Sequence, residues 1–185
     1  MKIALFGGSF NPIHNGHLQV AEEILKQGAA DQVWLIPCGN HAFNKQLVEG
    51  KKRMDMINLV ITANPQIKVV SVEMDETRKS YSSKTIAWFK NNFPHEFFWV
   101  LGADNLKDLP KWHDFEYLKN NVQFILINRP GYKIEPTEVE VVKIIEIHNE
   151  VSSTKIRENI AAGKDLAGLV PEVVESFIKK EGLYT

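Results

Sequence analysis

Short continuous runs of apolar residues recur along this chain. They are rich in valine, isoleucine, phenylalanine and tryptophan, and they occupy residues 3–6, 33–37, 67–72, 97–101 and 122–128. A less regular region after residue 131 leads to a further predicted strand at 142–147. Because the runs are continuous and do not alternate with polar residues, the corresponding strands should be covered on both faces. The pattern therefore predicts a buried parallel sheet.

Stretches with helical periodicity lie between these runs, at residues 18–27, 51–63, 83–93 and 115–119, and two more follow at 153–162 and 171–180. Alternation of strands and helices predicts right-handed crossovers and a doubly wound, Rossmann-like α/β fold. We expect one domain over residues 1–185, with a small helical part at about 150–185. Folds of this kind bind ligands beyond the carboxyl ends of their strands.

A glycine turn with two histidines follows the first predicted strand directly, and it reads Gly7-Gly8-Ser9-Phe10-Asn11-Pro12-Ile13-His14-Asn15-Gly16-His17. At such a junction, free backbone N–H groups and the positive end of the helix dipole attract phosphate. Two glycines let the main chain approach a ligand closely, and histidines three residues apart lie on one side of a helical turn. The spacing is neither that of the dinucleotide fingerprint nor that of the Walker loop. We interpret the turn as a polyphosphate site; the alternative is that both histidines cap the helix or pack in the core.

A second motif, Val151-Ser152-Ser153-Thr154-Lys155-Ile156-Arg157, opens the helix predicted at 153–162. Serine and threonine at this position are ordinary helix caps, which is the alternative explanation. Arg157 adds a guanidinium group that can bind an anion with two parallel hydrogen bonds. Together, the two motifs predict that both ends of the chain meet around one triphosphate.

These motifs resemble the signatures of the nucleotidyltransferase superfamily that carries H-x-G-H, in which both histidines contact the phosphates of a nucleoside triphosphate. Further stretches are similar to bacterial nicotinate mononucleotide adenylyltransferases, namely Gly102-Ala103-Asp104-Asn105, Leu109-Pro110-Lys111-Trp112, Asn128-Arg129-Pro130-Gly131-Tyr132, Gly168-Leu169-Val170-Pro171 and Glu181-Gly182-Leu183-Tyr184. The matches extend from residue 3 to residue 184. The resemblance implies an enzyme of NAD biosynthesis that transfers the adenylyl group of ATP to nicotinic acid mononucleotide, giving deamido-NAD and pyrophosphate.

The resemblance also implies roles for individual residues. It assigns catalysis to His14, His17 and Arg157. It assigns ATP binding to Gly7, Gly8, Ser9, Phe10, Lys45, Gly102, Asp104, Ser152, Ser153 and Thr154. It assigns mononucleotide binding to Tyr81, Ser82, Trp112 and His113, with Trp112 stacked on the pyridine ring. The alternatives are a helix cap for Asp104 and a core position for Trp112.

Four positions depart from the usual wording of the family. Asn11 stands where an aspartate is common, and we expect that difference to have little effect. The alignment of Lys45 is open, because the residues before it differ from the family pattern. Ser82 replaces a threonine and His113 an aromatic residue, so nicotinamide mononucleotide stays an alternative substrate. A phosphopantetheine adenylyltransferase or a cytidylyltransferase is a further alternative, but neither gives a reason for a tryptophan at 112.

The amino-acid composition limits the classes of ligand and partner that the protein can bind. The chain has 185 residues, 22 basic and 23 acidic, and a net charge of −1, which argues against a nucleic-acid binder. Its single cysteine, Cys38, excludes an intramolecular disulfide and a multi-cysteine zinc site, and it fits a reducing cytoplasm. The sequence shows neither a secretory signal nor a membrane span. We expect Mg²⁺ to arrive with ATP and no metal bound by the protein alone, while a homo-oligomer stays open.

Overall fold

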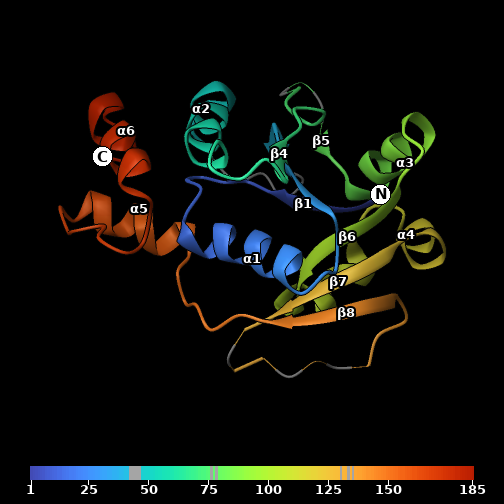
Figure 1. The fold of residues 1–185 in the computed structure, drawn as a ribbon. Helices are drawn as coiled ribbons and strands as arrows, with labels where there is room; N and C mark the ends of the chain where they lie inside the picture. The colour runs from blue at the N-terminus through green and yellow to red at the C-terminus, as the bar shows by residue number, and fades with distance from the viewer. Residues whose placement is uncertain (42–46, 76, 78, 130, 133, 135) are drawn as a thin grey trace.

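The computed structural model describes residues 1–41, 47–75, 77, 79–129, 131–132, 134 and 136–185. Its centre is a six-stranded sheet with the order β4-β2-β1-β6-β7-β8 (Figure 1). The strands are β1 (Lys2–Gly8), β2 (Gln32–Pro37), β4 (Ile67–Val69), β6 (Glu96–Gly102), β7 (Gln123–Asn128) and β8 (Glu140–Glu146). All neighbouring strands are parallel, which confirms the predicted sheet.

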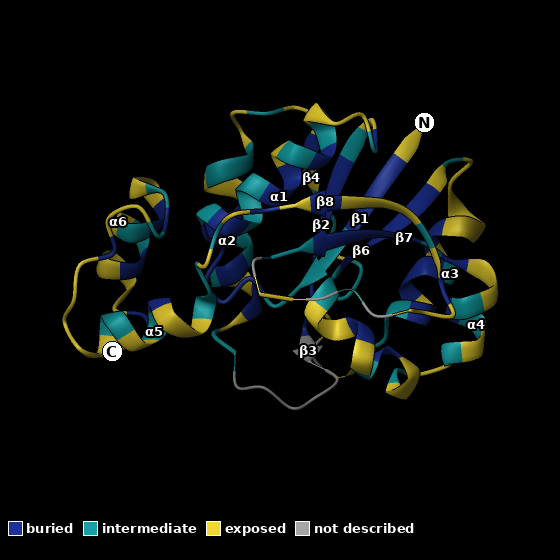
Figure 2. Ribbon diagram, turned by 90° about the horizontal axis from the view of Figure 1, so that it is seen from below, coloured by how far each residue is buried: buried dark blue, intermediate teal, exposed yellow. Residues whose placement is uncertain are grey.

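Helices cover both faces of the sheet. In the described part of the chain, the α-helices are α1 (Asn15–Lys26), α2 (Gly50–Ile61), α3 (Ser82–Asn92), α4 (Phe115–Asn121), α5 (Ser153–Ala161) and α6 (Glu172–Glu181). One hydrophobic core joins the sheet to α1, α2, α5 and α6, and a second joins the opposite face to α3 and α4. Strands β1, β2, β6 and β7 are accordingly buried along most of their length, whereas the edge strand β8 and the outer surfaces of the helices are largely exposed (Figure 2). The predicted doubly wound α/β fold is confirmed.

The strand order locates the ligand crevice. From β1 the chain builds outward through β2 and β4 on one side, and it then returns to build β6, β7 and β8 on the other. The connections that follow β1 and β6 therefore leave the sheet in opposite directions. This divergence opens a crevice at the carboxyl ends of these two strands, where doubly wound proteins bind nucleotides.

Several details differ from the expectation. Helix α1 begins at Asn15, three residues before the predicted start, and β4 ends at Val69, although the Val70 N–H still donates to the Leu35 carbonyl. The two-residue strands β3 (Asn40–His41) and β5 (Lys79–Ser80) pair with each other, and they are too short to leave a periodic pattern.

A 3₁₀ helix, η1 (Ala103–Lys111), was also not predicted. Its buried residues, Leu106 and Leu109, are three positions apart. That spacing suits a helix of three residues per turn, and it is too short a signal to read from sequence.

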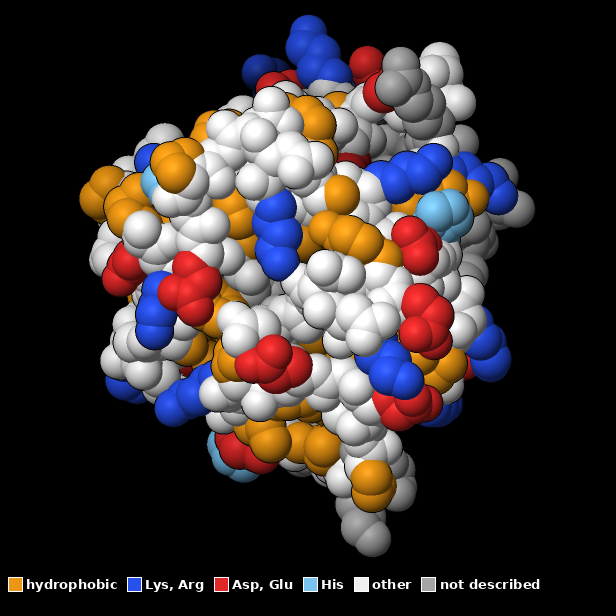
Figure 3. Space-filling view, turned by 90° about the vertical axis from the view of Figure 1, so that its right-hand side faces the viewer, with side chains coloured by type: hydrophobic (Ala, Val, Ile, Leu, Met, Phe, Trp, Pro, Cys, Tyr) orange, Lys and Arg blue, Asp and Glu red, His pale blue; other side chains and the backbone are white. Residues whose placement is uncertain are grey.

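Two further features concern the helices and the surface. Within the described residues, no helix combines the length and the apolarity that a membrane crossing requires. On the face shown in Figure 3, acidic and basic side chains are interspersed over most of the surface.

Candidate active site

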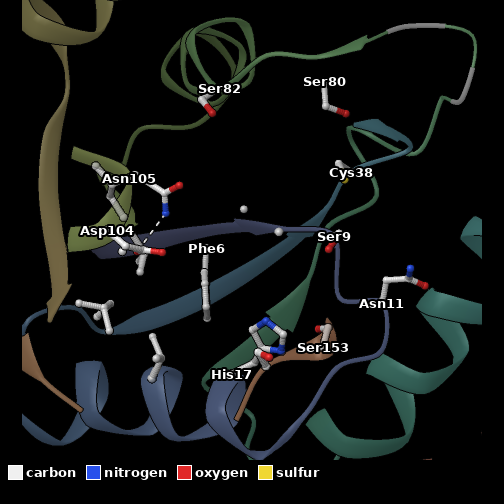
Figure 4. A pocket seen from close by; sticks show the side chains of 18 of the residues that line it. Phe6, Ser9, Asn11, His17, Cys38, Ser80, Ser82, Asp104, Asn105 and Ser153 are labelled. Atoms are coloured by element: carbon white, nitrogen blue, oxygen red, sulfur yellow. Dashed lines mark hydrogen bonds between the residues drawn. The ribbon is translucent and has the colours of Figure 1, made fainter. Parts of the chain in front are cut away.

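A cavity of about 1460 Å³ opens at the carboxyl ends of β1, β6 and β7. Its walls include 15 of the predicted site residues, which are Gly7, Gly8, Ser9, His14, His17, Tyr81, Ser82, Gly102, Asp104, Trp112, His113, Ser152, Ser153, Thr154 and Arg157. Phe10 does not line the cavity, and Lys45 lies outside the described residues. The cavity therefore brings together residues from both ends of the chain and from its middle (Figure 4).

The two histidines form a stacked pair. His14 is the N-cap residue of α1 and His17 is the third residue inside the helix; their ring centroids are 3.7 Å apart. The His14 backbone N–H donates to His17 Nδ1 at 3.3 Å. A neutral imidazole that accepts at Nδ1 carries its hydrogen on Nε2, so His17 can donate a hydrogen bond from that atom. The capping role considered as an alternative is thus present, and it orients the ring for a second role.

Burial keeps this pair uncharged. Burial, together with the positive charge of Arg129, lowers the pKa of His14 to about 4. Burial, then His14 and Arg129, hold the pKa of His17 well below its usual value. At neutral pH both rings are therefore neutral, so each can donate a hydrogen bond but neither carries a positive charge.

The glycines of the first motif make room for rings. A Cβ on Gly16 would lie 3.1 Å from His14 Cε1 and Nδ1. A Cβ on Gly7 would lie 2.6 Å from the Trp99 ring, and one on Gly8 would lie 3.1 Å from the Phe10 ring. A side chain at position 7 would therefore force the Trp99 ring to move, whereas at positions 8 and 16 the neighbouring ring would have to yield by a few tenths of an ångström. The sequence itself indicated only the approach of a ligand.

Phe10 packs against the first motif from the interior of the protein. Its side chain is fully buried and packs edge-to-face on His17, with ring centroids 4.9 Å apart. Its φ of 44° is in the left-handed region, which a bulky residue rarely adopts. The turn is therefore held in an unusual conformation by the packing of this ring.

Side chains of the second motif donate hydrogen bonds to backbone carbonyls of the first motif. Arg157 Nη1 donates to the Asn11 carbonyl at 2.9 Å, and Nη2 donates to Thr154 Oγ1 at 3.2 Å. Ser153 Oγ donates to the Pro12 carbonyl at 3.0 Å. Ser152 caps α5 by accepting the Lys155 N–H at 3.2 Å, so the capping alternative also holds. The predicted convergence of the two motifs is confirmed.

A separate group of aromatic residues lines another part of the cavity. Tyr81 stacks on His113 with ring centroids 4.2 Å apart, and Ser83 Oγ lies 3.1 Å from His113 Nδ1. Trp112 lines the cavity while also packing on the second core, so both of its predicted roles are compatible with its position. Asp104 lies in the first turn of η1 and not at its N-cap, which is Gly102.

Comparison with known proteins agrees with this architecture. The cytidylyltransferase-like family model matches residues 5–159. The nicotinate-nucleotide adenylyltransferase of Bacillus subtilis is 37% identical over 187 residues, covering 99% of this chain and 98% of the relative. A probable nicotinate-nucleotide adenylyltransferase of Bacillus pumilus is also 37% identical, with the same coverage.

The chain belongs to the nicotinate-nucleotide adenylyltransferase family. Solved structures agree on the fold. The Plasmodium falciparum nicotinic acid mononucleotide adenylyltransferase complexed with NaAD superposes with a TM-score of 0.83, at 22% identity and with 99% and 97% of the two chains covered. A Vibrio parahaemolyticus structure, titled a Putative Nicotinate-nucleotide Adenylyltransferase, gives a TM-score of 0.71, at 21% identity and with 99% and 94% of the two chains covered.

Two charged residues that contribute to the site were not identified from the sequence. Arg129 lines the cavity after β7, and its charge lowers the pKa of both histidines. Arg53 of α2 is completely buried and donates to the carbonyls of Val48, Ser9 and Cys38 at 2.8, 2.9 and 2.7 Å. It thereby ties the turn after β1 to the end of β2. Arg129 was visible as part of the stretch Asn128–Tyr132, whereas Arg53 looked like an ordinary polar position of an amphipathic helix.

The cavity offers few ligands to a metal ion. Among the described residues, no group of three or more histidine, cysteine or acidic side chains could hold one. The acidic residues among the described lining residues are Glu73 and Asp104. Glu73 accepts a hydrogen bond from the Thr85 hydroxyl group, and burial raises the pKa of its carboxyl group.

Proposed function

We propose that this chain transfers the adenylyl group of ATP to nicotinic acid mononucleotide, forming deamido-NAD and pyrophosphate. Membership of the nicotinate-nucleotide adenylyltransferase family supports this assignment. The observation that carries it is the meeting of the two motifs at one cavity, where Arg157 bonds to the turn that presents the stacked histidines.

The reaction suits a site without a nucleophilic side chain. The 5′-phosphate of the mononucleotide is largely a dianion at neutral pH, since its second pKa is about 6. One of its oxygens attacks the α-phosphorus of ATP. The bond between the α-phosphorus and the oxygen that bridges it to the β-phosphorus breaks, and pyrophosphate leaves with that electron pair. Neither a general base nor a covalent intermediate is needed. The protein has to align two anions that repel each other and to stabilise the charge on the leaving group.

The residues around the turn can supply these interactions. His17 offers a neutral Nε2–H donor, Arg129 adds positive charge near it, and Arg157 adds positive charge at the turn that leads to it. The backbone N–H groups at the start of α1 add the positive end of the helix dipole. Fixed donors of this kind stabilise developing charge without reorganising during the reaction.

Magnesium enters this proposal as a companion of ATP. The described lining residues include too few carboxylates to hold the ion alone, whereas a triphosphate supplies oxygen ligands of its own. We infer that Mg²⁺ carried on the triphosphate would offset part of the negative charge of ATP.

The aromatic group of the cavity is the proposed site for the pyridine ring. Trp112, Tyr81 and His113 line this part of the cavity, Tyr81 is stacked on His113, and Ser82 lies at the start of α3. The N-terminal end of a helix favours an anion, which supports the acid over the amide as the substrate. Nicotinamide mononucleotide is the alternative, and direct comparison of the two decides between them.

We also propose that the protein works in the cytoplasm without a nucleic-acid partner, as its composition predicts. Whether a second copy of the chain associates with the first is measured by light scattering coupled to size-exclusion chromatography.

His17→Ala tests the proposed mechanism. Loss of one preorganised donor typically lowers turnover by about a hundred- to a thousandfold. We expect such a fall in kcat for dinucleotide synthesis, with a melting temperature close to that of the native protein. Glu22→Ala, on the exposed surface of the same helix, is the matched control. Near-normal synthesis by the His17 variant would refute the role assigned to this ring.

A further inference from the structure

Asn11 holds an unusual position in the first motif. Its side chain is only 3% exposed, and its Oδ1 atom accepts two hydrogen bonds. One comes from the Tyr184 hydroxyl at 2.9 Å, and the other comes from the Val48 backbone N–H at 3.2 Å. A carbonyl oxygen has two lone pairs, so both acceptor positions of this amide are used. The donors lie 173 and 37 residues away along the chain.

The backbone of the same residue is also held. Arg157 Nη1 donates to the Asn11 carbonyl, and Ser153 Oγ donates to the carbonyl of the next residue, Pro12. Three distant segments therefore form hydrogen bonds to the turn between β1 and α1 at or next to Asn11. The turn that leads to His14 and His17 is fixed by side chains from outside, which preorganises it for an anion.

The surroundings of Tyr184 favour its hydrogen bond to Asn11. Its ring packs against the core shared by α1, α2, α5 and α6, and the residue also lines the cavity. Burial raises the pKa of its hydroxyl group, which therefore stays protonated and able to donate at neutral and alkaline pH. Its φ of 66° lies in the left-handed region, an unfavourable conformation for a bulky side chain that the surrounding contacts must stabilise.

We propose that Tyr184 and Asn11 act as a positioning pair for the reaction: the phenol holds the Asn11 side chain, and through it the turn, where His17 and Arg157 can face the same phosphates. This inference rests on the proposed adenylyl transfer. The required property of Asn11 is its capacity to accept two hydrogen bonds, which an aspartate shares. The amide N–H₂ group is not required.

Two substitutions at Asn11 test which property matters. Asn11→Ala removes the acceptor and with it both hydrogen bonds that fix the turn, so we expect a loss of about tenfold or more in kcat/KM for ATP. Asn11→Asp keeps the acceptor and should recover most of that activity. Equal losses in the two variants would overturn the proposal, because they would make the amide N–H₂ group the important one.

A double-mutant cycle tests the pairing. Tyr184→Phe removes only the hydroxyl group, and we expect kcat/KM for ATP to fall about five- to tenfold. In the Asn11→Ala background the same substitution should have no further effect, because its partner is already gone. Independent, multiplying losses would overturn the pairing. Tyr117→Phe, on α4 at the second core, is the matched control.

The outcomes also separate this inference from the proposed function. If the native protein makes no dinucleotide, the proposed function fails, and the pair is then judged by the dissociation constant of ATP measured by calorimetry across the same cycle. If the native protein is active and all four forms of the cycle have equal kcat/KM and equal ATP affinity, the positioning role alone is wrong. Melting temperatures of the four forms show whether a loss of activity merely follows unfolding.

Discussion

Gly16→Ala probes the stacked histidines without removing either of them. Gly16 is a buried residue in the first turn of α1. The added Cβ would lie 3.1 Å from His14 Cε1 and Nδ1, with the Val151 carbonyl 3.5 Å away on another side. Ordinary contacts begin at 3.4 Å, so the His14 ring must yield by a few tenths of an ångström. Because His14 stacks on His17 at 3.7 Å, the displacement is passed to the second ring.

The expected effects on stability and on rate differ. Alanine is favoured over glycine inside a helix by about 1 kcal/mol, while overpacking typically costs about 1–3 kcal/mol. The net change in the free energy of unfolding should therefore stay within about 2 kcal/mol, or roughly 8 °C in melting temperature. A misplacement of about 1 Å in an active site can lower a rate a hundredfold, so a few tenths predict a fall of about three- to tenfold in kcat.

The assay is pyrophosphate release at saturating ATP and nicotinic acid mononucleotide. The variant is compared with the native protein and with Glu22→Ala at the exposed surface of α1. A folded Gly16→Ala protein with native kcat would refute the reasoning, since it would mean that the position of the His14 ring does not influence the reaction.

Two further predictions concern stability. The pKa of His14 is lowered from 6.5 to about 4, so the unfolded chain binds a proton between these values that the folded protein does not. Stability should therefore fall as the pH drops from 7 to 4, by about 3 kcal/mol from this group, and urea unfolding of His14→Asn should show a shallower pH dependence; an unchanged slope would contradict this cause. Arg53→Met leaves the carbonyls of Val48, Ser9 and Cys38 without their donor and should destabilise the fold by about 3 kcal/mol or more. The urea midpoint measures the loss against Lys51→Met at the exposed surface of α2, and equal midpoints would show that Arg53 is dispensable.

The sheet and the meeting of the two motifs could be predicted from sequence because both follow from local patterns. Continuous apolar runs placed the strands, and the glycine turn and the serine-rich motif each stood at a strand–helix or helix boundary. In a parallel sheet, the carboxyl ends of all strands lie on one edge. Residues at the carboxyl ends of different strands, such as Gly8 and Gly102, therefore had to face one crevice.

The supporting contacts could not be predicted, because they join segments that share no local pattern. Nothing near Tyr184 in the sequence indicates that its hydroxyl bonds to Asn11, 173 residues away. Arg53 resembles an exposed helical residue until the fold buries it, and the stacking of Tyr81 on His113 depends on the unpredicted 3₁₀ helix η1. Such contacts are set by tertiary packing.

The most direct test of the account is a single assay with ATP and either nicotinic acid mononucleotide or nicotinamide mononucleotide at equal concentration, in which dinucleotide and pyrophosphate are both quantified. We predict equal amounts of the two products and a preference for the acid of more than about tenfold in kcat/KM, equivalent to roughly 1.4 kcal/mol. Absence of dinucleotide with both mononucleotides, under conditions in which the protein binds ATP, would contradict the assignment.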